Sequence, residues 1–425
     1  MDSSTAGSGP SAPIAATERV EILDILRGVA ILGILLVNAR MFFEPIALHA
    51  SGGRWWHGWL DQTVGALTVF LAQAKFYALF AFLFGLGFAI QSERAAARGA
   101  TFAGFFARRL VWLAAIGLAH ALLVWFGDIL FLYAIIGLLL IPFRGRKPRT
   151  LAIWAGILFF LPVAFQALQL GAVELGRIFA ADEIERSLLE SRESMTVWAT
   201  DARAAYSTGD LGDLFAIRSR EWGLVVGVGL IGVGPQVLGL FLVGLAFGRA
   251  RFFQNLPAHL PGMRRAAPVL LACGVAGGLV QVVGMLRADP LVPSVLGLLA
   301  SISQTFLAPA MTAFYVSAIC LLVQHEAWHR RLAPLAAVGR LALSNYLMHS
   351  VVFSLVSYSY GLGLYGRVRP SVALILALAL YAAQIPLSQW WVARYRFGPA
   401  EWLWRSLTYG TPQPMRRAQP HAAPG

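Results

Sequence analysis

The sequence predicts an all-α membrane protein, a polytopic bundle of about ten transmembrane helices. Its 425 residues are 58% apolar and only 13% charged, whereas a soluble domain carries roughly 25% charged residues. Apolar stretches recur along most of the chain, and each has about the 20 residues that cross a bilayer core. Arginines gather in the short polar interruptions, as they do in the loops of membrane proteins.

The predicted spans are helices rather than strands of a barrel. Each segment is continuously apolar and lacks the alternation of a transmembrane strand. We place helices near residues 23–43, 63–90, 108–126, 128–143, 150–173, 222–247, 267–286, 294–323, 335–359 and 371–393. The boundary between the third and fourth helices, at Gly127, requires a very tight turn unless one of the two is re-entrant.

The arginine-rich loops predict the orientation. Cytoplasmic loops carry an excess of Lys and Arg, and the basic loops after the second, fourth, sixth, eighth and tenth helices share one side if both termini are cytoplasmic. We therefore expect two helical halves, 21–173 and 222–409, around an extracytoplasmic segment at 174–221. The N-terminal tail 1–20 and the C-terminal tail 410–425 are predicted to be disordered.

Composition also excludes several classes of function. A net charge of +13 would indicate nucleic-acid binding in a soluble chain, but here topology explains the charge, so we expect no nucleic acid. Cys273 and Cys320 lie in separate apolar segments, which predicts neither a disulfide framework nor a zinc site. We expect no metal and no bound cofactor. The expected partners are the lipid bilayer and a small-molecule or lipid-linked substrate.

The first helix carries polar residues in an apolar stretch. Asp24 and Arg27 are three residues apart, so their side chains can pair. Asn38 lies eleven residues beyond Arg27, about 16 Å farther across the membrane on the same face. Because buried charge is costly in a membrane, this polar face is a candidate substrate-binding surface. The structural alternative is an interfacial Arg27 and an Asn38 that only packs, which leaves Asp24 poorly explained.

Three further residues are candidate catalytic groups. Lys75 is expected near the middle of the second helix, where it needs a carboxylate, a water cavity or a depressed pKa; Asp24 and Asp128 are its candidate partners. A purely structural ion pair is the alternative. His120 is expected within the third helix, with Asp128 at the turn that follows, and an imidazole can serve as a general base near neutral pH.

Near the C-terminus, one predicted helix carries Arg340, Asn345 and His349. Asn345 and His349 are four residues apart and share a face, and we include Arg340 and Asn345 among the substrate-binding candidates. The segment FGPAEWLWRSLTYG that follows is predicted to be amphipathic and interfacial, with Glu401 able to pair with Arg405.

Several blocks resemble the YeiB-like family of bacterial inner-membrane proteins. They are LDILRGVAILGILLVN, KFYALFAFLFGLGFAI, GLAHALLVWFGDILFLYAIIG, VGRLALSNYLMHS and RFGPAEWLWRSLTYG. The resemblance implies a multi-pass protein of the inner membrane. The family is distantly similar to transmembrane acyltransferases, which pass an acyl group from a cytoplasmic donor such as acyl-CoA to a sugar across the membrane.

In the best-known branch of those enzymes, an arginine on the first helix is followed eleven residues later by a catalytic histidine. Arg27 matches the arginine, but position 38 is Asn. The resemblance therefore leaves the base to His120, or to His49 or His57 in the loop after the first helix.

We expect an acyltransferase-like membrane enzyme in which Arg27 holds an anionic donor and His120 acts as general base. The alternatives are a transporter that uses its interior charges and a non-catalytic scaffold. A tunnel that opens beside Arg27 and ends near a histidine favours transfer, whereas a midplane cavity between pseudo-symmetric halves favours transport.

Overall fold

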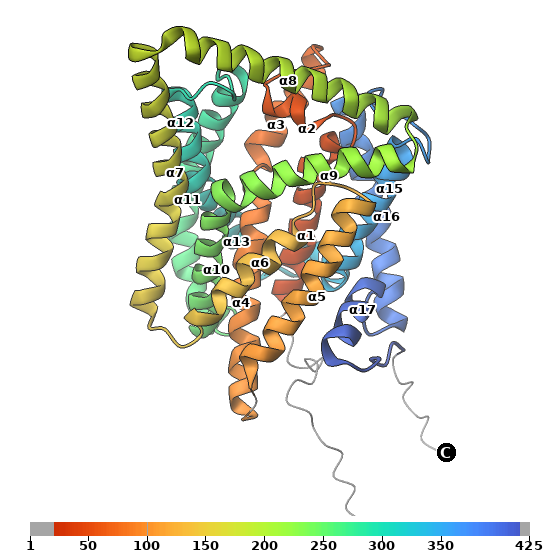
Figure 1. Cartoon of the computed structure of the whole chain (residues 1–425). Helices are drawn as coiled ribbons and strands as arrows, with labels where there is room; N and C mark the ends of the chain where they lie inside the picture. Colours follow the sequence, from red (N-terminus) through yellow and green to blue (C-terminus); the bar gives the residue numbers. More distant parts are fainter. Residues whose placement is uncertain (1–20, 100, 417–425) are drawn as a thin grey trace, which may run out of the picture.

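The computed structural model describes residues 21–99 and 101–416, which form a bundle of α-helices without strands (Figure 1). The predicted all-α fold is confirmed. The helices are α1 (Glu21–Asn38), α2 (Ile46–Ala50), α3 (Trp59–Leu71), α4 (Phe76–Ala97), α5 (Phe102–Leu123), α6 (Leu130–Leu140), α7 (Pro148–Phe179), α8 (Ala181–Thr208), α9 (Leu211–Val228), α10 (Gly234–Arg249), α11 (Leu256–Arg287), α12 (Val295–Ile302), α13 (Ala308–Leu322), α14 (Glu326–Arg340), α15 (Ala342–Ser357), α16 (Pro370–Arg394) and α17 (Pro399–Tyr409).

Every predicted span contains helix, but not every one is long enough to cross a membrane. Eight segments of the described chain have the length and apolar composition of a span: Glu21–Phe42, Trp59–Ala97, Phe102–Leu123, Pro148–Phe179, Leu211–Arg249, Leu256–Arg287, Val295–Leu322 and Pro370–Arg394. The predicted fourth and ninth spans correspond to the shorter apolar helices Leu130–Phe143 and Ala342–Ser357. The polytopic bundle is thus confirmed with eight full-length spans in the described residues.

Two of the predicted helices are broken. Residues 72–75 interrupt the second span between α3 and α4, and Ala74 has a positive φ of 66° there. Lys75 therefore precedes α4 and does not lie within a continuous helix. The predicted helix at 335–359 divides at Leu341, so that Arg340 ends α14 while Asn345 and His349 belong to α15.

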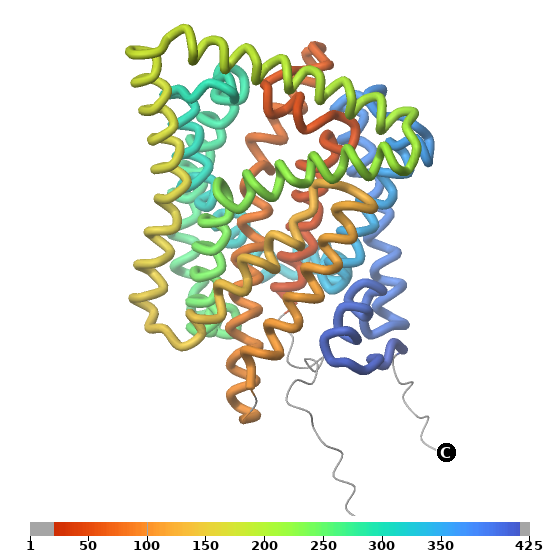
Figure 2. The backbone as a smooth tube through the Cα atoms, viewed as in Figure 1, coloured from red at the N-terminus to blue at the C-terminus, as the bar shows by residue number. Residues whose placement is uncertain are grey.

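The segment at 174–221 is helical and covers one end of the bundle. Figures 1 and 2 show α8 running across this end and α9 crossing the bundle beneath it, before the chain turns into α10. The π-helical turn η4 (Gly229–Val233) joins α9 to α10. We call this the α8 end of the bundle. The opposite end, which we call the α17 end, holds α17 and the connection between α4 and α5.

Glycines let two helix pairs approach closely. A Cβ at Gly339 of α14 would lie 1.8 Å from the Asp24 carbonyl oxygen of α1, and one at Gly28 would lie 2.3 Å from the Leu335 carbonyl oxygen. A Cβ at Gly244 of α10 would lie 2.0 Å from the Phe82 carbonyl oxygen of α4. Small residues at helix interfaces permit such approaches in membrane bundles. The α1–α14 contact brings Arg340 beside Asp24 and Arg27.

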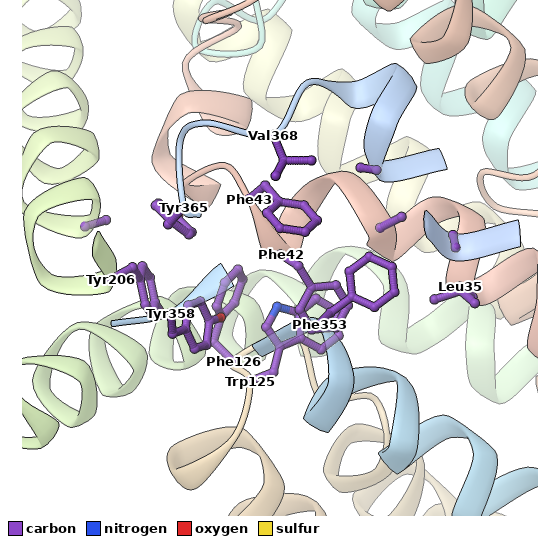
Figure 3. Packing of buried hydrophobic residues seen from close by; sticks show 14 of the residues in the cluster. Leu35, Phe42, Phe43, Trp125, Phe126, Tyr206, Phe353, Tyr358, Tyr365 and Val368 are labelled. Atoms are coloured by element: carbon purple, nitrogen blue, oxygen red, sulfur yellow. The ribbon is translucent and has the colours of Figure 1, made fainter. Parts of the chain in front are cut away.

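An aromatic cluster fills the bundle toward the α8 end (Figure 3). Phe42 stacks on Trp125 with ring centroids 4.2 Å apart, and Phe353 lies 5.0 Å from Phe42. Tyr206 and Tyr358 stack at 4.4 Å in the same cluster. Through α15, these contacts join the C-terminal end of α8 to the turn between α5 and α6, so this end of α8 is part of the packed core.

The C-terminal tail is ordered farther than expected. Arg396 donates its backbone N–H to the Met415 carbonyl oxygen at 2.9 Å, and Trp402 Nε1 donates to the Gln413 carbonyl oxygen at 2.7 Å. Residues 410–416 therefore fold back beside α17 and supply the acceptors for these two donors, which would otherwise lack partners. The predicted disorder of 1–20 and 417–425 falls outside the described residues.

Candidate functional site

The α17 end contains a cavity of about 690 Å³. Its walls come from α1, α4, α5, α6, α14, α15 and α17. This volume lies within the range of about 300–1,000 Å³ that is typical of small-molecule sites. Asp24 and Arg27 line the cavity, as does Arg340, so three of the five predicted substrate-binding residues are brought together.

The charged lining of the cavity is strongly basic. Seven arginines line it against two carboxylates, those of Asp24 and Glu401; the arginines are Arg27, Arg94, Arg98, Arg108, Arg109, Arg340 and Arg405. The sequence indicated Asp24 and Arg27 as a pair, and the structure confirms it with Arg27 Nη1 at 2.8 Å from Asp24 Oδ1. A cluster of guanidinium groups is suited to phosphate or carboxylate because each presents parallel donors.

Contacts of α17 hold the wall of the cavity in place. Glu401 Oε1 accepts from the backbone N–H groups of Leu343 (2.8 Å) and Ser344 (3.2 Å), so the carboxylate caps α15 and does not form the predicted ion pair with Arg405. Burial raises the pKa of Glu401, although the hydrogen bonds from Ser344 and Leu343 oppose the shift. Trp404 Nε1 donates to the Arg109 carbonyl oxygen at 2.8 Å, and the Arg109 guanidinium lies 3.8 Å from the Trp404 ring centroid.

Away from the arginines, the cavity wall is apolar and reaches Tyr346. Aliphatic and aromatic side chains of α1, α4, α5 and α6 line this part; they include Ile31, Ile34, Phe80, Phe84, Leu110, Leu113, Ile129 and Leu130. The Tyr346 ring also lines the cavity and lies 5.4 Å from the His120 ring. The cavity thus runs from a basic end to a wall one aromatic ring away from His120.

His120 and Asp128 form a buried hydrogen-bonded dyad. His120 Nδ1 lies 2.7 Å from Asp128 Oδ2, and the two residues are 4% and 3% exposed. The other carboxylate oxygen, Oδ1, accepts the Phe131 N–H at 2.7 Å at the start of α6. Gly117 makes the approach possible, since a Cβ there would lie 2.6 Å from Asp128 Oδ1. The tight turn predicted at Gly127 therefore serves to bring the acid back to the histidine.

One ring nitrogen of His120 is left without a hydrogen bond within the described part of the chain. His120 Nε2 is buried and has no hydrogen-bond partner in the described residues. A carboxylate on Nδ1–H fixes the tautomer in which Nε2 carries the lone pair, and it stabilises the imidazolium that forms when Nε2 accepts a proton. This arrangement is that of an oriented general base.

Lys75 does not have the predicted acidic partner. Its side chain is fully buried, as expected, but Nζ donates to the Val69 carbonyl oxygen at 2.9 Å and to Gln281 Oε1 at 2.6 Å. In residues 21–99 and 101–416, no ion pair joins Lys75 to Asp24 or Asp128. The break at 72–75 explains the difference, because it turns Lys75 toward the end of α3 and toward α11. Lys75 is also absent from the cavity lining.

Asn38 and Asn345 are the other candidates that the structure places apart from the cavity. Asn38 is the last residue of α1, eleven residues beyond Arg27, and is not in the cavity wall. Asn345 Nδ2 donates to the Val338 carbonyl oxygen and to Ser388 Oγ, at 3.2 and 3.1 Å. His349 Nε2 lies 2.7 Å from Gln384 Oε1. Asn345 and His349 share a face, as predicted, but this face packs on α16.

The two histidines of the predicted external loop lie in different surroundings. His57 is exposed. His49 Nε2 lies 3.4 Å from Glu44 Oε2, which also accepts from Arg40 Nε at 2.6 Å. Burial, with a smaller effect of Arg40, lowers the pKa of His49 to about 3. His49 is therefore neutral near pH 7.

Sequence reasoning missed most of the cavity. Arg94, Arg98, Arg108 and Arg109 were interpreted as topology signals, and no spacing in the chain distinguishes an arginine that faces a cavity from one that faces bulk water. Tyr346 carried no signal either, because it lies in an apolar helix where an aromatic residue is ordinary packing.

The comparisons with known proteins cover most of the chain. Residues 247–411 match a family described as "Protein of unknown function (DUF418)". The chain is 32% identical over 422 residues to "Uncharacterized protein YxaH" of Bacillus subtilis (strain 168), covering 95% of this chain and 98% of that protein. It is 29% identical over 402 residues to "Uncharacterized protein YeiB" of Escherichia coli (strain K12), covering 92% and 96%. Such similarity from end to end shows that the chain belongs to the YeiB-like family.

Proposed function

We propose that this protein is a transmembrane acyltransferase that uses His120 as general base. The observation that carries the proposal is the single cavity that extends from the arginine cluster at the α17 end to the Tyr346 wall of the His120–Asp128 dyad. A cavity that leads from a basic opening toward a histidine suits transfer from an anionic donor.

The arginine cluster suits the head of a phosphorylated thioester donor such as acyl-CoA. Arg27 is held by Asp24 and remains 33% exposed at its side chain, so it can present donors to a ligand while its position is fixed. The apolar wall beyond it suits an acyl chain. In this proposal the α17 end faces the cytoplasm, in agreement with the excess of basic residues there.

The dyad supplies the proton transfer. His120 Nε2 takes the proton of an acceptor hydroxyl, and the oxygen of this hydroxyl bonds to the thioester carbonyl carbon. The carbon–sulfur bond then breaks, and the departing thiolate receives the proton from the imidazolium. Asp128 holds the imidazole ring in this orientation throughout, as the acid of a catalytic triad does. The products are an ester and a free thiol.

The proposal is tested with purified protein in nanodiscs and a radiolabelled acyl-CoA, together with lipid and glycan profiling of cells with and without the gene. We expect a labelled ester that is lost in His120→Gln and retained in His57→Gln, an exposed histidine that serves as control. Equal transfer by both variants would exclude His120 as the base. Unchanged lipids and glycans, together with altered uptake or export of a small molecule, would favour the transporter alternative.

A further inference from the structure

A buried arginine on the α8 side of the His120–Asp128 dyad lacks hydrogen-bond partners for one edge of its guanidinium group. Arg218 of α9 is 4% exposed. Its Nη1 donates to the carbonyl oxygens of Leu123 (2.6 Å) and Leu122 (3.3 Å). Its Nε and Nη2 are buried and have no hydrogen-bond partner in the described residues. These two nitrogens form the edge that binds a carboxylate or phosphate through parallel hydrogen bonds.

The nearest carboxylate on the same helix does not neutralise this edge. Glu221 is fully buried, and its Oε2 accepts from Tyr206 Oη at 2.6 Å while Oε1 accepts from the Ile46 N–H at 3.4 Å. In the described part of the chain, no ion pair joins Arg218 to a carboxylate. An unpaired buried charge is costly by several kcal/mol or more. The cost suggests that another group occupies this position when the protein works.

Tyrosines surround the guanidinium group. Its Cζ lies 5.3 Å from the Tyr358 ring centroid and 5.8 Å from that of Tyr360. Tyr358 is fully buried, and its hydroxyl oxygen is also without a partner in residues 21–99 and 101–416. Tyr360 is 40% exposed. Because Tyr360 is the exposed residue of the two, a ligand that approaches Arg218 from this side must displace its ring.

The position of Arg218 connects this site to the dyad. Leu122 and Leu123, which anchor Nη1, follow His120 by two and three residues at the end of α5. The guanidinium group thus lies within about one helical turn of His120 along the axis. The arginine cavity reaches the dyad from the α17 end, so the two basic sites lie on opposite sides of it.

We propose that Arg218, with Tyr358 and Tyr360, binds the anionic group of the acceptor, which is a hydroxylated molecule that carries a phosphate. The guanidinium edge holds the phosphate and leaves a hydroxyl for His120 Nε2. A polyol phosphate has both groups, either as a lipid headgroup or as a soluble molecule. The inference rests on the proposed acyl transfer for its role, whereas binding at Arg218 can be measured without transfer.

The experiment measures binding to the full-length protein from two sources of phosphate. Phosphatidylcholine nanodiscs with and without phosphatidylglycerol test the headgroup by native mass spectrometry, and glycerol 1-phosphate tests the soluble source by calorimetry. Arg218→Lys keeps the charge and a donor for Leu123 but loses the bidentate edge, and Arg218→Gln removes the charge. Arg220→Gln is the matched control, because Arg220 is exposed on the same helix and stacks on Trp198.

We expect wild type and Arg220→Gln to bind one of the two probes, and both Arg218 variants to bind it about tenfold or more weakly. The arginines of the cavity contribute equally to all four proteins, so the difference reports Arg218 alone. Equal binding by wild type and both Arg218 variants would overturn the inference. If neither Arg218 variant folds, Tyr360→Ala decides: faster association than wild type supports the site, and an unchanged rate contradicts it.

The same variants separate this inference from the proposed function. If Arg218→Lys changes neither acyl transfer nor the KM for the acceptor, the proposed transferase function is retained and the Arg218 site is contradicted. If binding depends on Arg218 but no donor supports acyl transfer, the anion site is retained and the proposed acyl transfer is contradicted.

Discussion

Asp128→Asn is the substitution that tests the dyad most directly. In wild type, Asp128 Oδ1 accepts the Phe131 N–H at 2.7 Å and Oδ2 lies 2.7 Å from His120 Nδ1. An asparagine must keep its side-chain oxygen toward Phe131, because the reverse orientation would place its NH₂ group against the Phe131 N–H, and both are donors. Its NH₂ group then donates to His120 Nδ1. The imidazole must therefore carry its proton on Nε2, which abolishes the lone pair that a general base needs.

Asp128→Asn has two expected effects, one on stability and one on the rate of transfer. The substitution exchanges two hydrogen bonds to a charged group, each worth about 1.5–3 kcal/mol, for two bonds to a neutral amide, each worth about 0.5–1.5 kcal/mol. We therefore expect the free energy of unfolding to fall by about 2 kcal/mol. Loss of a general base lowers the rate of transfer by about 10² to 10⁴. The expected outcome is a protein that still folds but is inactive.

Nitrogen NMR of protein labelled on histidine is the assay, combined with transfer kinetics and thermal unfolding. The signal of His120 should move from the tautomer protonated on Nδ1 to the one protonated on Nε2. Asp61→Asn is the control, since Asp61 is also buried but binds Ser371 elsewhere in the bundle. A wild-type His120 already protonated on Nε2, or full transfer activity in Asp128→Asn, would refute the reasoning.

Four further predictions concern the donor site, the packing, the topology and the pH response. Arg27→Lys should raise KM for the acyl donor about tenfold or more in transfer kinetics, because an ammonium cannot reproduce bidentate contact; an unchanged KM would move donor binding elsewhere. Gly244→Ala should lower the melting temperature, since its Cβ would lie 2.0 Å from the Phe82 carbonyl oxygen and overpacking costs about 1–3 kcal/mol. Thr208 is exposed at the end of α8, so Thr208→Cys should react with an impermeant maleimide in intact cells after Cys273 and Cys320 are replaced, whereas labelling only after permeabilisation would reverse the orientation. Because burial lowers the pKa of His49 from 6.5 to about 3, its contribution to stability is complete above pH 6.5 and is lost as the pH falls toward 3; the melting temperature of His49→Gln should therefore fall less than that of wild type between pH 7 and pH 4.

The sequence alone determined the features that follow from local chemistry and from the bilayer. Apolar stretches of spanning length must be helical in lipid, because no other local structure satisfies the backbone. The pairing of Asp24 with Arg27 follows from a spacing of three on a helix. His120 and Asp128 were also recognised as candidates, since both lie within one short block of the sequence.

Only the tertiary structure determined which residues far apart in the sequence lie next to each other. Lys75 takes Gln281 as a partner across 206 residues, because the chain breaks at 72–75 and no periodic pattern encodes that break. Glu401 caps α15 from 58 residues away and leaves Arg405 to the cavity. Arg109 and Arg340 are far apart in the chain but line the same cavity as Arg27, through the close α1–α14 contact at Gly339 and the docking of α17 on α5. An arginine in a loop has the same local sequence whether it faces water or a binding site, so convergence on a site is a property of the packed bundle.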